Sequence, residues 1–173
     1  MNWSFATRPR GPRDASYEGG IGMPKKIDVN STQTVTGSRY PPPYHEPCAR
    51  RLRRRLGDAA GLTQFGVNLT RLPAGGWSSQ RHWHAAEDEF VYVVEGELVL
   101  VTDAGEEILR AGDCAGFKAG EPDGHQLQNR SGKDALYLEV GSRCPQEDEV
   151  TYSDIDLKIK RGAGYTRKNG QPY

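Results

Sequence analysis

The chain has 173 residues, and its 23 lysines and arginines are balanced by 23 aspartates and glutamates. This length suits a single domain with its own core. The balanced charge gives no sign of a nucleic-acid or anionic-membrane partner. No apolar run approaches the roughly 18 to 20 residues of a membrane span. The three cysteines lack paired spacing, so we expect free thiols and a cytoplasmic location.

The two ends of the chain are polar, which accounts for a hydrophobic content of only 35%. Residues 1–22 show no periodicity, so we expect a disordered extension, and Met23 offers a second start. Residues 23–59 are expected to form an N-terminal arm with a proline-rich connector at residues 40–44. We expect this arm to pack on the rest of the protein or on a neighbouring subunit. A ligand for an SH3-like domain is the alternative.

Five arginines fall within the six residues from Arg50 to Arg55. Such a basic run can bind phosphate or nucleic acid. The favoured interpretation is an exposed edge strand or short turn whose charges prevent edge pairing. The zero net charge and the lack of a helix-turn-helix pattern support it. Steering of a sugar phosphate or an acidic substrate by this run is left open.

From residue 62 onwards the sequence is typical of many short strands separated by turns. Between Thr63 and Leu72, for example, Phe65, Val67 and Leu69 share one face. Turn sequences recur at intervals of about 8 to 12 residues, which favours an all-β sandwich or barrel. We expect an all-β barrel over residues 60–143. Residues 144–173 are expected to form a polar C-terminal arm, with a weak strand at 155–159 and a turn at Asn169-Gly170.

Histidines and a carboxylate gather within the predicted strands. His82 and His84 point to one face of a strand, and Glu89 begins the next strand on the same face as Val91 and Val93. We expect these side chains to converge from two adjacent antiparallel strands. His125 is the fourth candidate ligand. The alternative carboxylates, Glu87 and Asp88, fit the strand parity less well.

This donor set suits one divalent first-row metal, namely Mn, Fe, Co, Ni, Cu or Zn. An octahedral ion with four protein ligands keeps two positions for water, oxygen or substrate. Gln80 shares strand parity with His82 and His84, and Asn129 shares it with His125, so both are expected to line the cavity near the metal. For Asn129 a turn-forming role is the alternative. The sequence identifies no further catalytic residue.

The spacings around these residues resemble those of the cupin superfamily. The first cupin motif matches Gly76, His82, His84, Glu89 and Gly96, and the second resembles Gly112, Gly120, His125 and Asn129. The second motif departs at Lys118, where proline is usual, and in its longer turn before His125. The resemblance implies a double-stranded β-helix, or jelly-roll barrel, with polar arms at both ends. It also implies one metal held by His82, His84, Glu89 and His125.

Cupin relatives include dioxygenases, decarboxylases, sugar isomerases and epimerases, lyases and non-catalytic sensors. We therefore expect a metal-dependent enzyme that acts on an oxygen-rich small molecule, such as a carbohydrate or organic acid. A non-catalytic binding or sensing protein is the alternative. A homodimer is also expected, because jelly-roll sheets leave edge strands and the arms are available to a neighbour. We expect neither a nucleic-acid nor a membrane partner.

Overall fold

The computed structural model describes residues 26–160 and 162–173, so the extension expected over residues 1–22 lies outside it. Regular structure in the described part is almost entirely β, which confirms the predicted fold class. Two short helical segments, η1 (Glu46–Cys48) and α1 (Leu56–Ala59), complete it. None of the described helices has the length and apolar character needed to cross a membrane. The strands are β1 (Thr34–Thr36), β2 (Leu52–Arg55), β3 (Phe65–Leu72), β4 (His82–His84), β5 (Glu89–Glu95), β6 (Glu97–Thr102), β7 (Gly105–Arg110), β8 (Cys114–Phe117), β9 (Gln126–Gln128), β10 (Ala135–Ser142), β11 (Glu149–Tyr152), β12 (Lys158–Lys160) and β13 (Gly164–Thr166).

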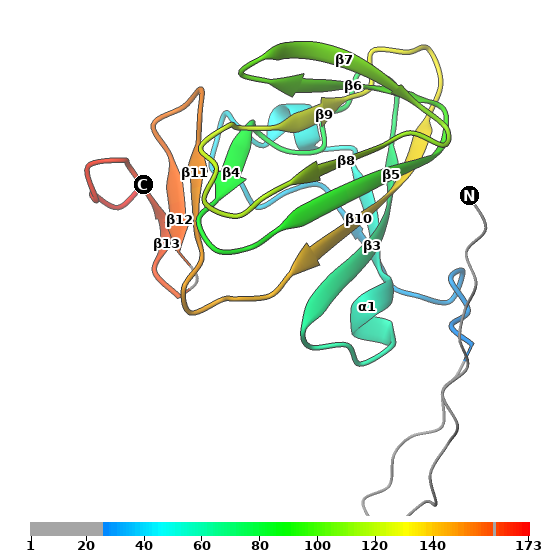
Figure 1. Ribbon diagram of the computed structural model, residues 1–173, viewed down its shortest axis with the longest axis horizontal. Coiled ribbons are helices and arrows are strands. Elements are labelled where there is room, and N and C mark those ends of the chain that lie inside the picture. Colours follow the sequence, from blue (N-terminus) through cyan, green and yellow to red (C-terminus); the bar gives the residue numbers. More distant parts are fainter. Residues whose placement is uncertain (1–25, 161) are drawn as a thin grey trace, which may run out of the picture.

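The strands form a jelly-roll sandwich (Figure 1). One sheet has six strands in the order β1-β2-β3-β10-β5-β8, and two smaller sheets have the orders β7-β6-β9 and β13-β12-β11-β4. The smaller sheets meet where His82 and His125 exchange backbone hydrogen bonds of 3.1 and 2.9 Å. The two predicted metal-binding motifs are therefore joined directly through their backbones.

The core lies between the sheets and follows the alternation of side chains along each strand. In β5, Val91 and Val93 are buried, while Phe90, Tyr92 and Val94 face outwards. The buried cluster contains Leu72, Val91, Val93, Leu98, Leu100, Leu109, Leu127, Ala135 and Tyr137. Burial of each large apolar side chain stabilises the fold by about 1.5–3 kcal/mol, so this cluster fixes the frame on which the site is built.

The arginine-rich strand is an interior strand, and the prediction of an exposed edge strand was wrong. β2 pairs with β3 on one side and with β1 on the other. Its central charge is compensated within the sandwich, since Arg53 Nη2 lies 2.6 Å from Glu139 Oε1 on β10. Pairing on both sides and this ion pair allow a strongly basic strand to lie inside a sheet.

The C-terminal segment adds three strands to the sheet that contains β4. β11 pairs with β4, placing Val150 opposite His84 and Tyr152 opposite His82. The strand expected at 155–159 lies at Lys158–Lys160 instead. The turn predicted at Asn169-Gly170 is confirmed, with a hydrogen bond of 2.9 Å from Gly170 N–H to the Arg167 carbonyl. This tail therefore supports the strand that carries two of the predicted ligands.

Candidate metal centre

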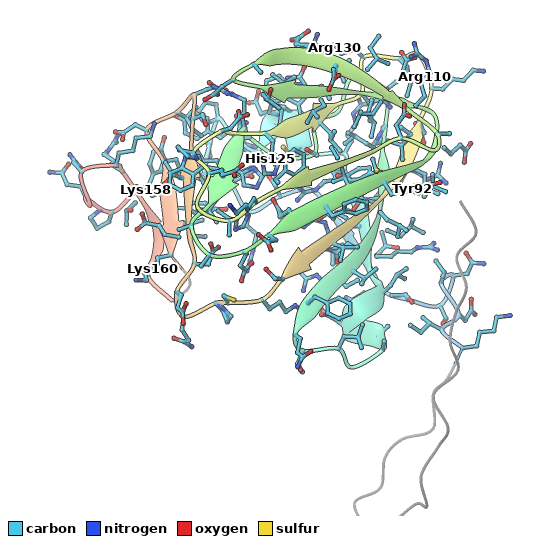
Figure 2. The ribbon with its side chains drawn as sticks, in the orientation of Figure 1. Tyr92, Arg110, His125, Arg130, Lys158 and Lys160 are labelled. Carbon is cyan, nitrogen blue, oxygen red and sulfur yellow. The ribbon has the colours of Figure 1, made fainter. Side chains whose placement is uncertain are left out.

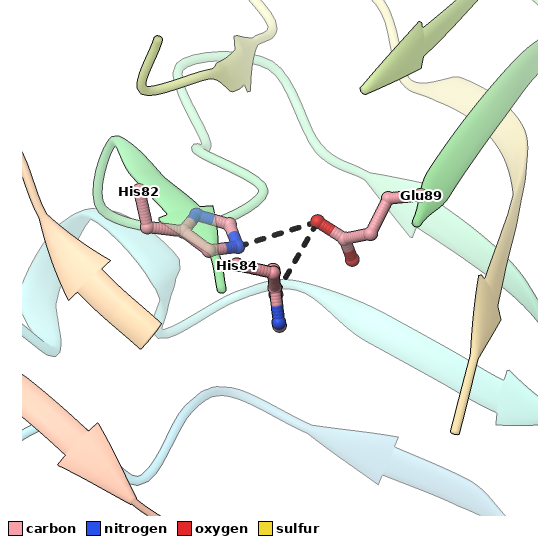
Figure 3. A group of neighbouring side chains, drawn as sticks. All are labelled: His82, His84 and Glu89. Carbon is pink, nitrogen blue, oxygen red and sulfur yellow. Dashed lines mark ion pairs between the residues drawn. The ribbon is translucent and has the colours of Figure 1, made fainter. Parts of the chain in front are cut away.

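The two histidines of β4 and Glu89 of β5 face one another across the interior (Figure 3). They do not lie on adjacent strands, as the sequence suggested. β4 pairs with β11, whereas β5 pairs with β10 and β8. Residues 85–88 form a crossing loop rather than a hairpin turn, because their N–H groups bond elsewhere: Ala86 to Asp148 and Asp88 to Ser142.

All four predicted ligands meet at one carboxylate oxygen. Glu89 Oε2 lies 3.5 Å from His82 Nε2, 3.4 Å from His84 Nε2 and 2.9 Å from His125 Nε2. The donor atoms of His82, His84 and Glu89 all lie within 4.8 Å of one another. His125 lies inside the molecule near β4 (Figure 2).

The two alternative carboxylates accept hydrogen bonds from backbone N–H groups. Glu87 accepts a hydrogen bond of 2.7 Å from Cys144 N–H, and Asp88 accepts one of 2.8 Å from Ala119 N–H. Among the three acidic residues at 87–89, Glu89 is thus the one that contacts all three imidazoles.

Hydrogen bonds set the protonation of the histidine rings. His82 Nδ1 lies 2.9 Å from the Gln80 carbonyl, which can only accept, so Nδ1 carries the proton. His84 Nδ1 lies 2.7 Å from Asp148 Oδ2 in the same arrangement. In the neutral rings, each Nε2 therefore keeps its lone pair directed at the cluster, which is the form that a metal requires. The His125 ring is held instead by stacking on Phe117, with centroids 3.6 Å apart and planes 3° apart.

The electrostatics of the cluster favour a bound cation. Burial alone would raise the pKa of Glu89, but the hydrogen bond from His125 and the close approach of His82 and His84 outweigh it and hold this pKa well below its usual range. Burial lowers the pKa of His125 and keeps its ring neutral. For His84, burial also lowers the pKa, yet the hydrogen bond to Asp148 prevails and raises it. An ionised carboxylate among imidazoles is the donor set that divalent transition metals prefer, so the residues fit such an ion.

The cluster lies on the wall of a cavity of about 500 Å³. Both ends of the described chain contribute to this wall: the segment from Val35 to Tyr40 from the N-terminal side, and Tyr152 and Tyr165 from the C-terminal side. Cavities of about 300–1,000 Å³ are the usual size for small-molecule sites. The geometry therefore provides room for an organic molecule beside the candidate metal ligands.

Two expected cavity residues have other roles. Gln80 donates its side-chain N–H to the Tyr44 carbonyl at 2.8 Å, and Asn129 donates to the carbonyls of Leu72 and Lys133. Neither lines the cavity, so this expectation is corrected. The reason is that both residues lie just outside a strand, where side chains no longer alternate strictly. Asn129 has the turn-forming role that was the alternative.

Sequence reasoning missed Asp148, and it left a substrate-steering role of the arginine run open without placing the run at the site. Asp148, which holds His84, lies 64 residues away in the sequence, and no local pattern marks it. Arg51, Arg53 and Arg55 all line the cavity, and their alternate spacing was a usable signal because alternate residues of a strand share a face.

Comparisons with known proteins agree with this architecture. A family model for the cupin domain matches residues 68–141, whereas no curated protein matches the chain. A crystal structure from Silicibacter pomeroyi, described as a sugar phosphate isomerase of the cupin superfamily, is 48% identical, covers 86% of this chain and 96% of its own, and has a TM-score of 0.81. A chain from Acidithiobacillus ferrooxidans, provisionally described as a sugar phosphate isomerase, is 28% identical over 68% of this chain and 75% of its own, with a TM-score of 0.63.

A third structure shows the fold alone. The polyketide cyclase RemF from Streptomyces resistomycificus is 22% identical over 68% of this chain and 78% of its own, with a TM-score of 0.55. The motif spacing, the sandwich and the long alignment with the Silicibacter pomeroyi structure lead to one conclusion. The chain belongs to the cupin superfamily.

Proposed function

We propose that His82, His84, Glu89 and His125 bind one divalent transition metal and that the chain is an isomerase of a small sugar phosphate. The observation that carries this proposal is the convergence of three imidazoles on one carboxylate at the wall of a cavity of about 500 Å³. The reaction class is supported by the 48% identical chain from Silicibacter pomeroyi, which is described as a sugar phosphate isomerase.

A metal bound there would supply a Lewis acid that polarises a carbonyl oxygen. The residues around it hold the substrate in place and exclude bulk water. Interconversion of an aldose and a ketose moves a proton between neighbouring carbons, so a second acid–base group is needed. Within the described part of the chain, Glu139 is the second carboxylate on the cavity wall, and Thr70 and Asn68 hold it through hydrogen bonds of 3.1 and 3.3 Å. We assign the proton transfer to Glu139.

The test combines metal analysis with turnover. Purified protein is analysed for bound metal and assayed with a panel of aldose and ketose phosphates. His84→Ala is expected to lose both metal and turnover. The matched control is His45→Ala, which removes the one histidine outside the cluster and should retain both. Metal-free protein with full turnover would end the proposal. Metal binding without turnover on any sugar phosphate of the panel would favour the non-catalytic alternative.

We also propose a homodimer, with the outer face of β5 as its interface. Phe90, Tyr92 and Val94 are exposed there to 42, 41 and 43%, and Figure 2 labels Tyr92 on this strand. A twofold axis brings the same apolar surface from two copies together. Light scattering should give twice the chain mass, and Tyr92→Lys should reduce it to the monomer. A monomeric wild type would contradict the proposal. The cytoplasmic location stays a prediction.

A further inference from the structure

β2 and the residue just before it present arginines to the cavity. Arg51, Arg53 and Arg55 occupy alternate positions and all line it; together they are called the arginine face here. Arg54 lies on the opposite face, where it donates to the Val29 carbonyl and to Asn30. The arginines on one face of this segment therefore reach the cavity, whereas Arg54 on the other face holds the N-terminal segment.

The charge of the arginine face is only partly compensated. Arg51 donates from Nη1 and Nη2 to the backbone carbonyls of Ser78 and Gly37, which are neutral. Arg53 forms an ion pair with Glu139 through Nη2. The carboxylate nearest to Arg55, that of Asp58, lies 3.9 Å away.

The cavity as a whole is cationic although the chain has no net charge. Among the residues that the structure describes, four arginines line it, Arg39 and the three of the arginine face, against two carboxylates, Glu89 and Glu139. The wall thus has an excess of two positive charges before any metal is bound. A low-dielectric cavity of one sign concentrates its field on a small anion of the opposite sign.

Several buried polar atoms beside the arginine face lack a partner in the described part of the chain. They are the Nε atoms of Arg51 and Arg53 and the hydroxyls of Ser38 and Tyr137, all of which belong to residues of the cavity wall. Tyr137 is only 1% exposed. Buried polar atoms are normally hydrogen-bonded, so these exceptions mark the wall beside the arginine face as unusually polar.

The arginine face and Glu89, one of the four candidate metal ligands, lie on different strands of the same sheet. β3 and β10 separate β2 from β5, which carries Glu89. With strands about 4.8 Å apart, the two backbones are roughly 14 Å apart. The arginine and glutamate side chains bridge part of this distance. The remaining space fits a molecule with a handful of carbon atoms between its two ends.

We propose that the arginine face is a binding site for the phosphate group of the substrate, with the sugar end directed at the metal ligands. Arg51 and Arg53 both present their guanidinium groups to the cavity, and Arg51 supplies the charge that no carboxylate compensates. A phosphate monoester carries about −1.5 to −2 charges near pH 7, which matches the excess of two positive charges. This inference rests on the proposed function for the sugar end only, since phosphate binding requires no turnover.

The test measures binding of inorganic phosphate by calorimetry to protein stripped of metal with a chelator, so that coordination to an ion is excluded. The variants are Arg51→Met and Arg53→Lys; the second keeps a charge beside Glu139 and so protects the fold. Each should bind phosphate roughly 10- to 100-fold more weakly, the value of a charge-assisted hydrogen bond. Arg54→Met removes the same charge from the other face and should change the affinity less than about twofold. Thermal unfolding of each variant shows whether it is folded.

Equal phosphate affinity in wild type and the folded Arg51→Met and Arg53→Lys variants would overturn the inference. The inference would also be overturned if Arg54→Met lost as much phosphate affinity as the other variants, or if the wild type bound no phosphate. The two proposals fail in different ways. Phosphate binding that depends on Arg51, without isomerase turnover, would contradict only the proposed function. Turnover with the same KM for a sugar and its phosphate would contradict only the phosphate site.

Discussion

Asp148 is the residue whose replacement tests the metal centre most directly. Its Oδ2 accepts from His84 Nδ1 at 2.7 Å, and its Oδ1 accepts from Ala86 N–H at 3.0 Å. Asparagine has the same shape but only one acceptor oxygen. If that oxygen accepts from Ala86 N–H, the amide NH₂ group faces His84. The NH₂ group can only donate, so His84 Nδ1 must then accept a hydrogen bond and cannot carry the ring proton. The ring proton then moves to Nε2, the atom that must bind the metal. Loss of such an orienting group weakens metal binding by about 10- to 100-fold, or about 1.4–2.7 kcal/mol.

The assay is competition with a chromophoric chelator for Zn²⁺ and Mn²⁺ at constant pH. Asp148→Asn is compared with Glu149→Gln, which changes the neighbouring residue and its 2.5 Å contact with Lys158 but leaves His84 alone. The control should bind metal as the wild type does. If the two variants have the same metal affinity, the orienting role of Asp148 is refuted. Rescue is expected from Asp148→Glu only if the longer side chain still reaches Nδ1.

Three further predictions concern the stability of the fold and the chemistry of the cluster. Removal of metal with a chelator should lower the melting temperature, because an ion present at 100 times its dissociation constant stabilises the fold by about 2.7 kcal/mol; an unchanged melting temperature would argue against occupancy. Metal affinity should fall as the pH is lowered from about 8 to 6. The pKa of His84 is raised, so its proton competes with the metal at a higher pH than that of an ordinary histidine, and Asp148→Asn should move the loss to lower pH. Gly96→Ala should reduce the free energy of unfolding by at least about 1–2 kcal/mol in urea, because Gly96 has a φ of 84° and a Cβ would lie 3.0 Å from the Asp134 carbonyl oxygen. A loss below about 0.5 kcal/mol would contradict that reasoning.

The parts of the fold that follow from local alternation were predictable. Val91 and Val93 face inwards, and the same parity places Glu89 inside the sandwich. The shared face of His82 and His84 follows from the same rule, and both contact Glu89. These inferences need only the period of two that every strand has.

The choice of pairing partner was not predictable, because it depends on segments far apart in the sequence. β4 pairs with β11, which follows it by more than 60 residues, rather than with the neighbouring β5. β2 becomes an interior strand because of β1, a strand of three exposed residues with no distinctive pattern.

The contribution of the two terminal segments to the cavity has a consequence for how relatives of this chain are compared. The matched cupin domain, residues 68–141, contains all four proposed metal ligands but neither Arg51 nor Asp148. Substitutions outside that domain can therefore change which ligand fits the cavity and how tightly the metal binds, while all four proposed metal ligands stay the same. Two proteins with identical metal ligands can therefore act on different substrates. Similarity between such proteins should be judged over the whole length of both chains.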